Sequence, residues 1–92
     1  SAQELQDATL LYKTVKGVKD ALEAETADPE VLEERAMKML DGHGWIPDYV
    51  AVVRRSDLLA PTKDDLINKT PLVVLAAAKI GTTRLIDNVE VF

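Results

Sequence analysis

Gly81-Thr82-Thr83-Arg84-Leu85-Ile86-Asp87-Asn88-Val89 is the stretch that decides the fold, because an apolar run precedes its glycine and a second patterned run follows. The preceding run, residues 71–80, reads PLVVLAAAKI and is too short to cross a membrane. Two such runs around Gly81-Thr82 predict a β-hairpin with a two-residue type II′ turn, since glycine adopts the required positive φ without strain. That turn fixes the register, in which the facing pairs are Ile80–Thr83, Ala78–Leu85, Ala76–Asp87, Val74–Val89 and Leu72–Val91.

Asp87 is the residue that breaks the pattern of this hairpin. The register makes one face of the sheet apolar except at Asp87, which lies opposite small alanines. A bare carboxylate is costly to bury. We therefore expect Asp87 to have a hydrogen-bonding or charged partner.

The apolar run leaves one alternative open. Thr70-Pro71 before it and Gly81 after it would also suit a buried helix from Leu72 to Ile80, because period alone cannot assign a short apolar run. The adjacent valines and the following turn favour a strand. A strand that is apolar on both faces belongs at the centre of a sheet, with a further strand at residues 83–91 beside it.

The first half of the chain predicts two amphipathic helices. Ser1 and Glu4 have capping-box spacing ahead of an apolar stripe formed by Leu5, Ala8, Leu11, Tyr12, Val15, Val18 and Leu22. Asp28 and Pro29 start the second helix as N-cap and first helical residue, and Gly42 is its natural C-cap. The stripe of this second helix is Leu32, Ala36, Met39 and Leu40. The short connection predicts an antiparallel helical hairpin.

Residues 49–54 (YVAVVR) are rich in β-branched side chains and predict the remaining strand. Residues 55–70 read as irregular, with single helical turns at 56–59 and 62–66. Helices first and strands later predict an α+β fold, an antiparallel helical hairpin packed on a three-stranded antiparallel β-sheet. We expect one domain, residues 1–92.

The composition is that of an ordinary globular protein with mild acidity. The chain is 47% apolar and 29% charged, with a formal net charge of −5, which argues against nucleic acid or an anionic membrane as partner. The absence of cysteine excludes disulfides and thiolate metal sites and fits a cytoplasmic location. We recognise no signal peptide, and the first residue, Ser1, is compatible with either an excised piece of a longer protein or a processed whole one.

Few residues point to chemistry. His43, the single histidine, lies in Gly42-His43-Gly44, where a loop position beside a helix C-terminus is favoured over a general base or a metal ligand. No second ligand or nucleophile stands at a recognisable spacing from it. We therefore assign no catalytic, ATP-binding or metal-binding residue.

Five polar residues on the strands remain as structural or binding candidates, namely Arg54, Arg55, Arg84, Asp87 and Asn88. Arg54 and Arg55 could clamp a phosphate or carboxylate, although a solvated strand end or a partner for Asp87 is favoured. Arg84, Asp87 and Asn88 could line a cleft. The favoured structural interpretation has Asp87 buried and paired, Asn88 bonding backbone groups, and Arg84 in a salt bridge on the opposite face.

Residues 76–88, AAAKIGTTRLIDN, resemble the C-terminal signature of the pantothenate synthetase (pantoate–β-alanine ligase) family, which is written as alanines, x-Leu-Gly and then Thr-Arg-Leu-Ile-Asp-Asn. Residues 47–53, PDYVAVV, resemble the preceding strand of that family at the right distance upstream. With the helical first half, the resemblance covers nearly the whole chain and supports a strand at residues 72–80. One departure is Arg54-Arg55, where many relatives carry acidic or neutral residues.

The resemblance implies an ATP-dependent ligase that joins (R)-pantoate to β-alanine through a pantoyl-adenylate, releasing AMP and pyrophosphate, on the route to coenzyme A. The family's catalytic and nucleotide-binding residues belong to an N-terminal Rossmann-type domain with His-x-Gly-His and Ser-Ser-Arg-Asn motifs, and this sequence contains neither motif. Residues 1–92 then correspond to the C-terminal lid domain, and the five candidates above become lid-facing candidates.

The resemblance also implies the partners. They are the chain's own N-terminal catalytic domain and, in a full-length homodimeric enzyme, the substrates pantoate, β-alanine and ATP with Mg²⁺. We expect residues 1–92 alone to bind no cofactor, to be inactive and to be monomeric. The alternative is a free-standing, non-enzymatic interaction domain that docks a partner on its sheet face or on an exposed strand edge.

Overall fold

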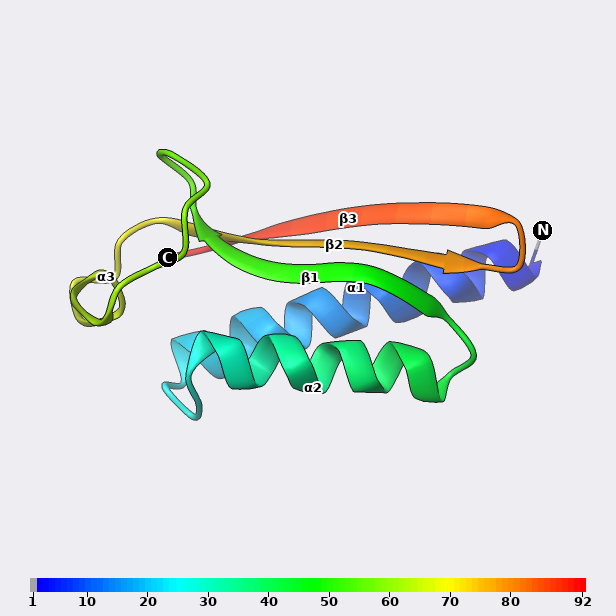
Figure 1. The fold of residues 1–92 in the computed structure, drawn as a ribbon, viewed down its shortest axis with the longest axis horizontal. Helices are drawn as coiled ribbons and strands as arrows, with labels where there is room; N and C mark the ends of the chain where they lie inside the picture. Colours follow the sequence, from blue (N-terminus) through cyan, green and yellow to red (C-terminus); the bar gives the residue numbers. More distant parts are fainter. Residues whose placement is uncertain (1) are drawn as a thin grey trace.

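The computed structural model describes residues 2–92, and the part of the predicted capping box that falls on Ser1 lies outside them. The elements in chain order are α1 (Ala2–Glu23), α2 (Pro29–Gly42), β1 (Ile46–Arg54), α3 (Lys63–Ile67), β2 (Leu72–Ile80) and β3 (Thr83–Val91). The two long helices lie antiparallel and cover the same face of the sheet, and within residues 2–92 no helix lies on the other face (Figure 1). The predicted α+β architecture is confirmed.

The sheet has the strand order β1-β2-β3, with both neighbouring pairs antiparallel, so the apolar β2 is central as predicted. The register of the β2–β3 hairpin is the one that a two-residue turn requires, from Ile80 opposite Thr83 to Leu72 opposite Val91. Gly81 has φ +60 and Thr82 is not in the positive-φ region, which distinguishes a type II′ turn from type I′. The helical alternative for residues 72–80 is therefore wrong.

The connection between the helices and the sheet differs in detail from the prediction. β1 begins at Ile46, three residues before the predicted start, and a bulge between Pro47 and Tyr49 lets the strand continue past the proline. The single helical turn predicted at 56–59 lies slightly earlier, at the end of β1, where the Leu58 amide donates to the Arg54 carbonyl at 2.8 Å. The turn at 62–66 is confirmed as α3, which Thr62 caps in a capping box with Asp65.

Side chains from both helices and from the inner sheet face form one core. Its largest fully buried side chains are Trp45, Leu11, Leu40, Leu72, Val15, Val52, Val74 and Val91. The predicted stripe of α1 is partly wrong, since Leu5 is 70% exposed and Ala8 and Tyr12 are also exposed, whereas Thr14 is buried. α1 packs against α2 as well as the sheet, which moves its buried arc toward the Thr14 side and leaves the Leu5–Tyr12 side in solvent. Met39 of α2 is exposed as well.

Both long helices end in a Schellman motif. At the end of α2, the Trp45 amide donates to the Leu40 carbonyl at 3.0 Å and the Gly44 amide to the Asp41 carbonyl at 3.0 Å. Gly44, with φ +84, therefore supplies the left-handed residue, and the C-cap is His43, one residue after the predicted Gly42. The same bonds close α1, where Glu25 occupies the left-handed position with φ +56.

Candidate functional site

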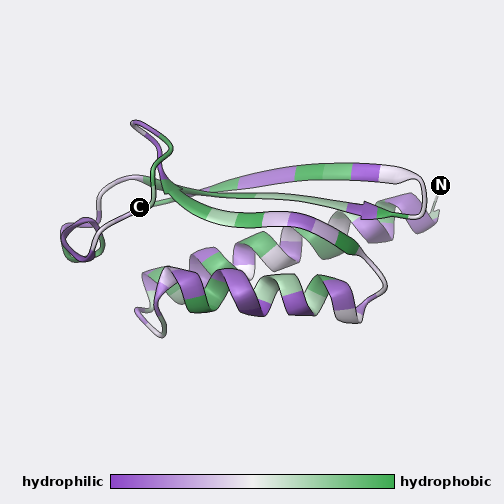
Figure 2. Ribbon diagram, in the orientation of Figure 1, coloured by the Kyte–Doolittle hydropathy of each residue, from purple (hydrophilic) through white to green (hydrophobic). Residues whose placement is uncertain are grey.

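The face of the sheet that the helices leave uncovered is the main candidate surface, and we call it the open sheet face. Alternation along the three strands places on it Tyr49, Ala51, Val53, Val73, Leu75, Ala77, Lys79, Arg84, Ile86, Asn88 and Glu90. β2 is green or pale along most of its length and turns purple only near its C-terminal end (Figure 2), where the sequence has Lys79. The open sheet face therefore has an apolar middle with charged side chains toward its ends.

Arg84 organises the end of this face beside the β2–β3 turn. Its Nε donates to Asp48 Oδ2 at 2.8 Å, and this pair spans β2 because the bulge of β1 turns Asp48 toward β3. The hydrogen bond to Asp48 raises the pKa of the Arg84 guanidinium. Two exposed apolar side chains flank the pair, Ile46 at 66% exposed and Ile86 at 64%. The predicted salt bridge of Arg84 on the face opposite Asp87 is confirmed.

Arg54 lies at the other end of β1 and is bound by two carboxylates. Its Nε and Nη2 donate to the two oxygens of Asp57 at 3.0 and 2.7 Å, and Nη1 lies 3.4 Å from Asp65 Oδ2. The bond to Asp57 raises the pKa of Arg54, and the same bond lowers the pKa of Asp57. The backbone amide of Thr62 is the main cause that lowers the pKa of Asp65. Arg54 thus holds the loop after β1 against α3.

Arg55 completes this end of the sheet. It donates to Glu90 Oε2 on β3 and, at 2.9 Å, to the carbonyl of Phe92. Within residues 2–92 neither arginine pairs with Asp87, so the expectation that one of them supplies its partner is wrong. Both arginines are engaged by groups of their own chain, which leaves no preformed bidentate clamp for an external anion.

Asp87 and Asn88 do not form a cleft with Arg84. Asp87 lies on the helix-facing side of β3 and is half-buried rather than buried as expected, because β3 is an edge strand. Its Oδ1 accepts the backbone amide of Asn88 at 2.8 Å, which is a neutral partner from its own strand. Asn88 is exposed on the open sheet face. The structure therefore separates these residues onto two faces.

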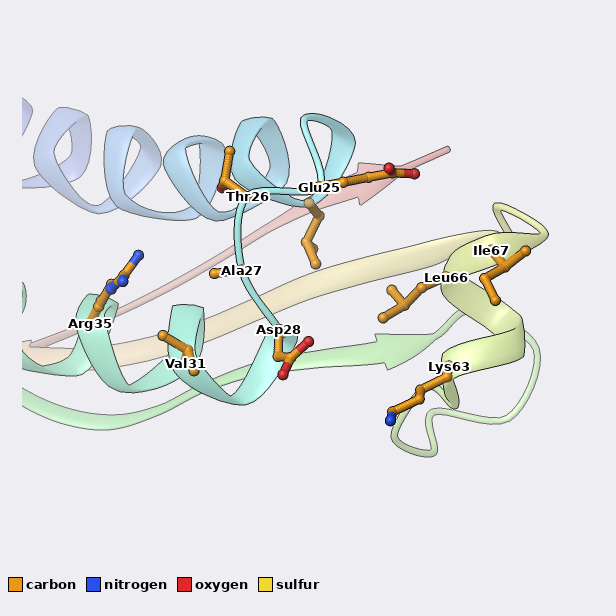
Figure 3. Close-up of a pocket in the computed structure, with 10 residues that line it drawn as sticks. Glu25, Thr26, Ala27, Asp28, Val31, Arg35, Lys63, Leu66 and Ile67 are labelled. Carbon is orange, nitrogen blue, oxygen red and sulfur yellow. The ribbon is translucent and has the colours of Figure 1, made fainter.

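A hollow that the sequence did not predict lies between the α1–α2 connection and α3 (Figure 3). It has a volume of about 720 Å³ and an apolar wall that includes Leu22, Val31 and Leu66. Glu25, Thr26, Asp28, Arg35 and Lys63 supply its polar rim, and Arg35 and Lys63 lie at opposite ends of it (Figure 3). The path of residues 60–70 brings α3 beside the α1–α2 connection. No local sequence pattern predicts this path.

These surfaces contain no catalytic machinery that we can recognise. In the part of the chain that the structure describes, no group of three or more His, Asp or Glu residues is placed to hold a metal ion. Nor does any helix within residues 2–92 have the length and hydropathy needed to cross a membrane. His43 lies at the C-terminus of α2, and its Nδ1 is 2.8 Å from the Met39 carbonyl, so the structural interpretation of this residue is supported.

The fold defines the class as an α+β protein with a helical layer on one side of an antiparallel sheet and an open face on the other. The family model described as Pantoate-beta-alanine ligase matches residues 1–90 of the 92. The chain belongs to the pantoate–β-alanine ligase family. Membership assigns the protein a ligase role in pantothenate biosynthesis.

Proposed function

We propose that residues 1–92 are the C-terminal lid domain of an ATP-dependent ligase that condenses (R)-pantoate with β-alanine through a pantoyl-adenylate. In this proposal ATP, Mg²⁺ and the reacting groups bind to an N-terminal catalytic domain in the cytoplasm, and this chain closes over them. The observation that carries the proposal is the family match across residues 1–90, on a chain whose sequence holds neither catalytic motif of the family. A lid excludes water from a hydrolysable acyl-adenylate and completes the substrate pocket.

The open sheet face is the surface that we assign to the catalytic domain. Its end with Arg84 and Asp48 lies beside the β2–β3 turn, and the first turn of α1 lies at the same end of the molecule (Figure 1). A domain joined ahead of α1 would therefore reach this end first. This end of the open sheet face combines exposed apolar side chains with one charged pair. Such a mixed surface is typical of contacts between domains that open and close, because these contacts are more polar than permanent interfaces.

The proposal is tested by adding the purified chain to a separately purified catalytic domain of the family and measuring pantothenate formation. We expect the chain to raise the activity of the catalytic domain and to bind no ATP by itself in calorimetric titration. The substitution Ile86→Asp on the open sheet face should weaken the stimulation without unfolding the chain, because Ile86 is 64% exposed.

Ile67→Asp is the matched control, since Ile67 is 74% exposed but lies on α3, at the end of the molecule away from the β2–β3 turn (Figure 1). Micromolar binding of ATP to the chain alone would contradict the assignment of all nucleotide chemistry to the other domain. No stimulation by the wild-type chain would favour the free-standing interaction domain.

A further inference from the structure

β1 and β3 are the two edge strands of the sheet, and other parts of the chain cover the edge of β1. On β1 the Val52 amide donates to Glu33 Oε2 of α2 at 2.8 Å, and the Arg54 amide donates to the Leu59 carbonyl at 2.9 Å. The bulge after Pro47 distorts the other half of this edge. A further strand could not pair along β1 without displacing these groups.

The edge of β3 has the same length as that of β1 and is much less covered. Ile80 and Thr83 close the two-residue turn, so Leu85, Asp87, Val89 and Val91 bond to β2 in alternation. The amides of Arg84, Ile86, Asn88 and Glu90 consequently point to the free edge. Asp87 Oδ1 covers the Asn88 amide at 2.8 Å, and within residues 2–92 we find no protein acceptor for the amides of Arg84, Ile86 and Glu90.

We propose that this edge can pair with the β3 edge of a second copy of the chain, antiparallel, and that Asp87 holds it closed. A two-fold pairing centred on Asp87 places Arg84 of each copy opposite Glu90 of the other, so opposite charges face each other and extend the ion pairs that Arg84 and Glu90 already form with Asp48 and Arg55 of their own chain. Leu85 would then face Val89, and two three-stranded sheets would become one. The partner that fits this charge pattern is the chain itself.

The carboxylate of Asp87 disfavours the two-fold strand registers centred on Ile86, Asp87 or Asn88, which keep the helix-facing residues of both copies on the same face of the joined sheet. Centred on Asp87, the pairing brings the two carboxylates together at a non-hydrogen-bonded pair, where side chains are closest. Centred on Ile86 or on Asn88, it places Asp87 against Leu85 or Val89. A charge that points inward on an edge strand is a known way to prevent sheets from joining. The same carboxylate also occupies the Asn88 amide that a new strand would need.

The test is the oligomeric state of the whole chain and of Asp87→Val, measured by sedimentation velocity over a range of concentrations. We expect a monomer for the wild type and a dimer for the variant. Ile86→Pro in the Asp87→Val background should restore the monomer, because proline removes an amide that faces the free edge and leaves the β2 ladder intact. Glu33→Val, which uncovers the Val52 amide on β1, should remain monomeric because the bulge and the loop still cover that edge.

Four results would overturn the inference: a dimeric wild type, a monomeric Asp87→Val, a dimeric Glu33→Val, or a double variant that still associates. Circular dichroism establishes that each variant is folded. If Asp87→Val is not, Asp87→Asn replaces it, since it keeps the shape and removes the charge, and a folded monomeric Asn variant overturns the inference equally. None of these outcomes depends on the proposed lid function.

Discussion

Glu25 is held in a left-handed conformation at the end of α1, and replacing it by glycine should stabilise the protein. The residue has φ +56 because the Thr26 amide donates to the Ala21 carbonyl at 3.1 Å and the Glu25 amide to the Leu22 carbonyl at 3.2 Å. A left-handed conformation costs an L-residue roughly 1–2 kcal/mol. Glycine avoids this cost but loses roughly 0.5–1 kcal/mol more backbone entropy on folding. At the midpoints of these two ranges, the net gain in unfolding free energy for Glu25→Gly is about 0.75 kcal/mol.

Thermal unfolding followed by circular dichroism measures this gain. For a domain of this size 1 kcal/mol moves Tm by about 4–8 °C, so Glu25→Gly should raise Tm by about 3–6 °C. Lys19→Gly is the control, because Lys19 lies in the interior of α1 and glycine there should lower Tm by a similar amount. A Tm for Glu25→Gly at or below that of the wild type would refute the assignment of strain to this residue.

Two further predictions concern the core and the ion pairs. Leu40 is 0% exposed, so Leu40→Ala should lower the unfolding free energy, measured by urea denaturation, by about 2–5 kcal/mol. Val31→Ala on the exposed side of α2 should lower it by well under half as much. Equal losses at both positions would contradict the placement of the core. The pKa values of Asp57 and Asp65 are lower in the folded state than in the unfolded chain. The stability that they contribute is therefore present above about pH 4 and is lost as the pH falls through their folded pKa values. Arg54→Gln should accordingly have a lower Tm than the wild type at neutral pH, and the difference in Tm should narrow below about pH 4. A difference in Tm that is constant with pH would show that the ion pairs of Arg54 do not contribute to stability.

The hairpin could be predicted from the sequence because its determinants are local. Gly81 and the spacing of the two apolar runs specify the turn, and a two-residue turn leaves one register for every pair from Ile80–Thr83 to Leu72–Val91. The start of α2 at Asp28-Pro29 could be predicted for the same reason, although the Asp28 side chain makes no capping bond. Where a single short motif decides the backbone, the sequence is sufficient.

The buried side of α1 could not be predicted, because it depends on two neighbours at once. The spacing of apolar residues shows that α1 is amphipathic but does not show that it contacts α2 through Thr14, whose hydroxyl lies 3.7 Å from the Met39 sulfur. The Thr14 hydroxyl donates to the Leu10 carbonyl at 2.9 Å, so its burial costs little. A polar residue that satisfies itself on its own helix can enter a core, and a hydropathy pattern alone cannot identify it.

Asp87 shows most clearly why the candidate site was harder to predict than the fold. A carboxylate on an apolar face led us to expect a buried ion, and for a central strand that argument would hold. β3 is an edge strand, so water reaches Asp87 from the side and the neighbouring amide of Asn88 is free to bind it. An arginine partner is therefore unnecessary, and Arg54 and Arg55 are used instead to fix the loop and the end of β3. The position of a strand in its sheet thus decides whether the same residue needs an ion-pair partner or acts against pairing with another sheet.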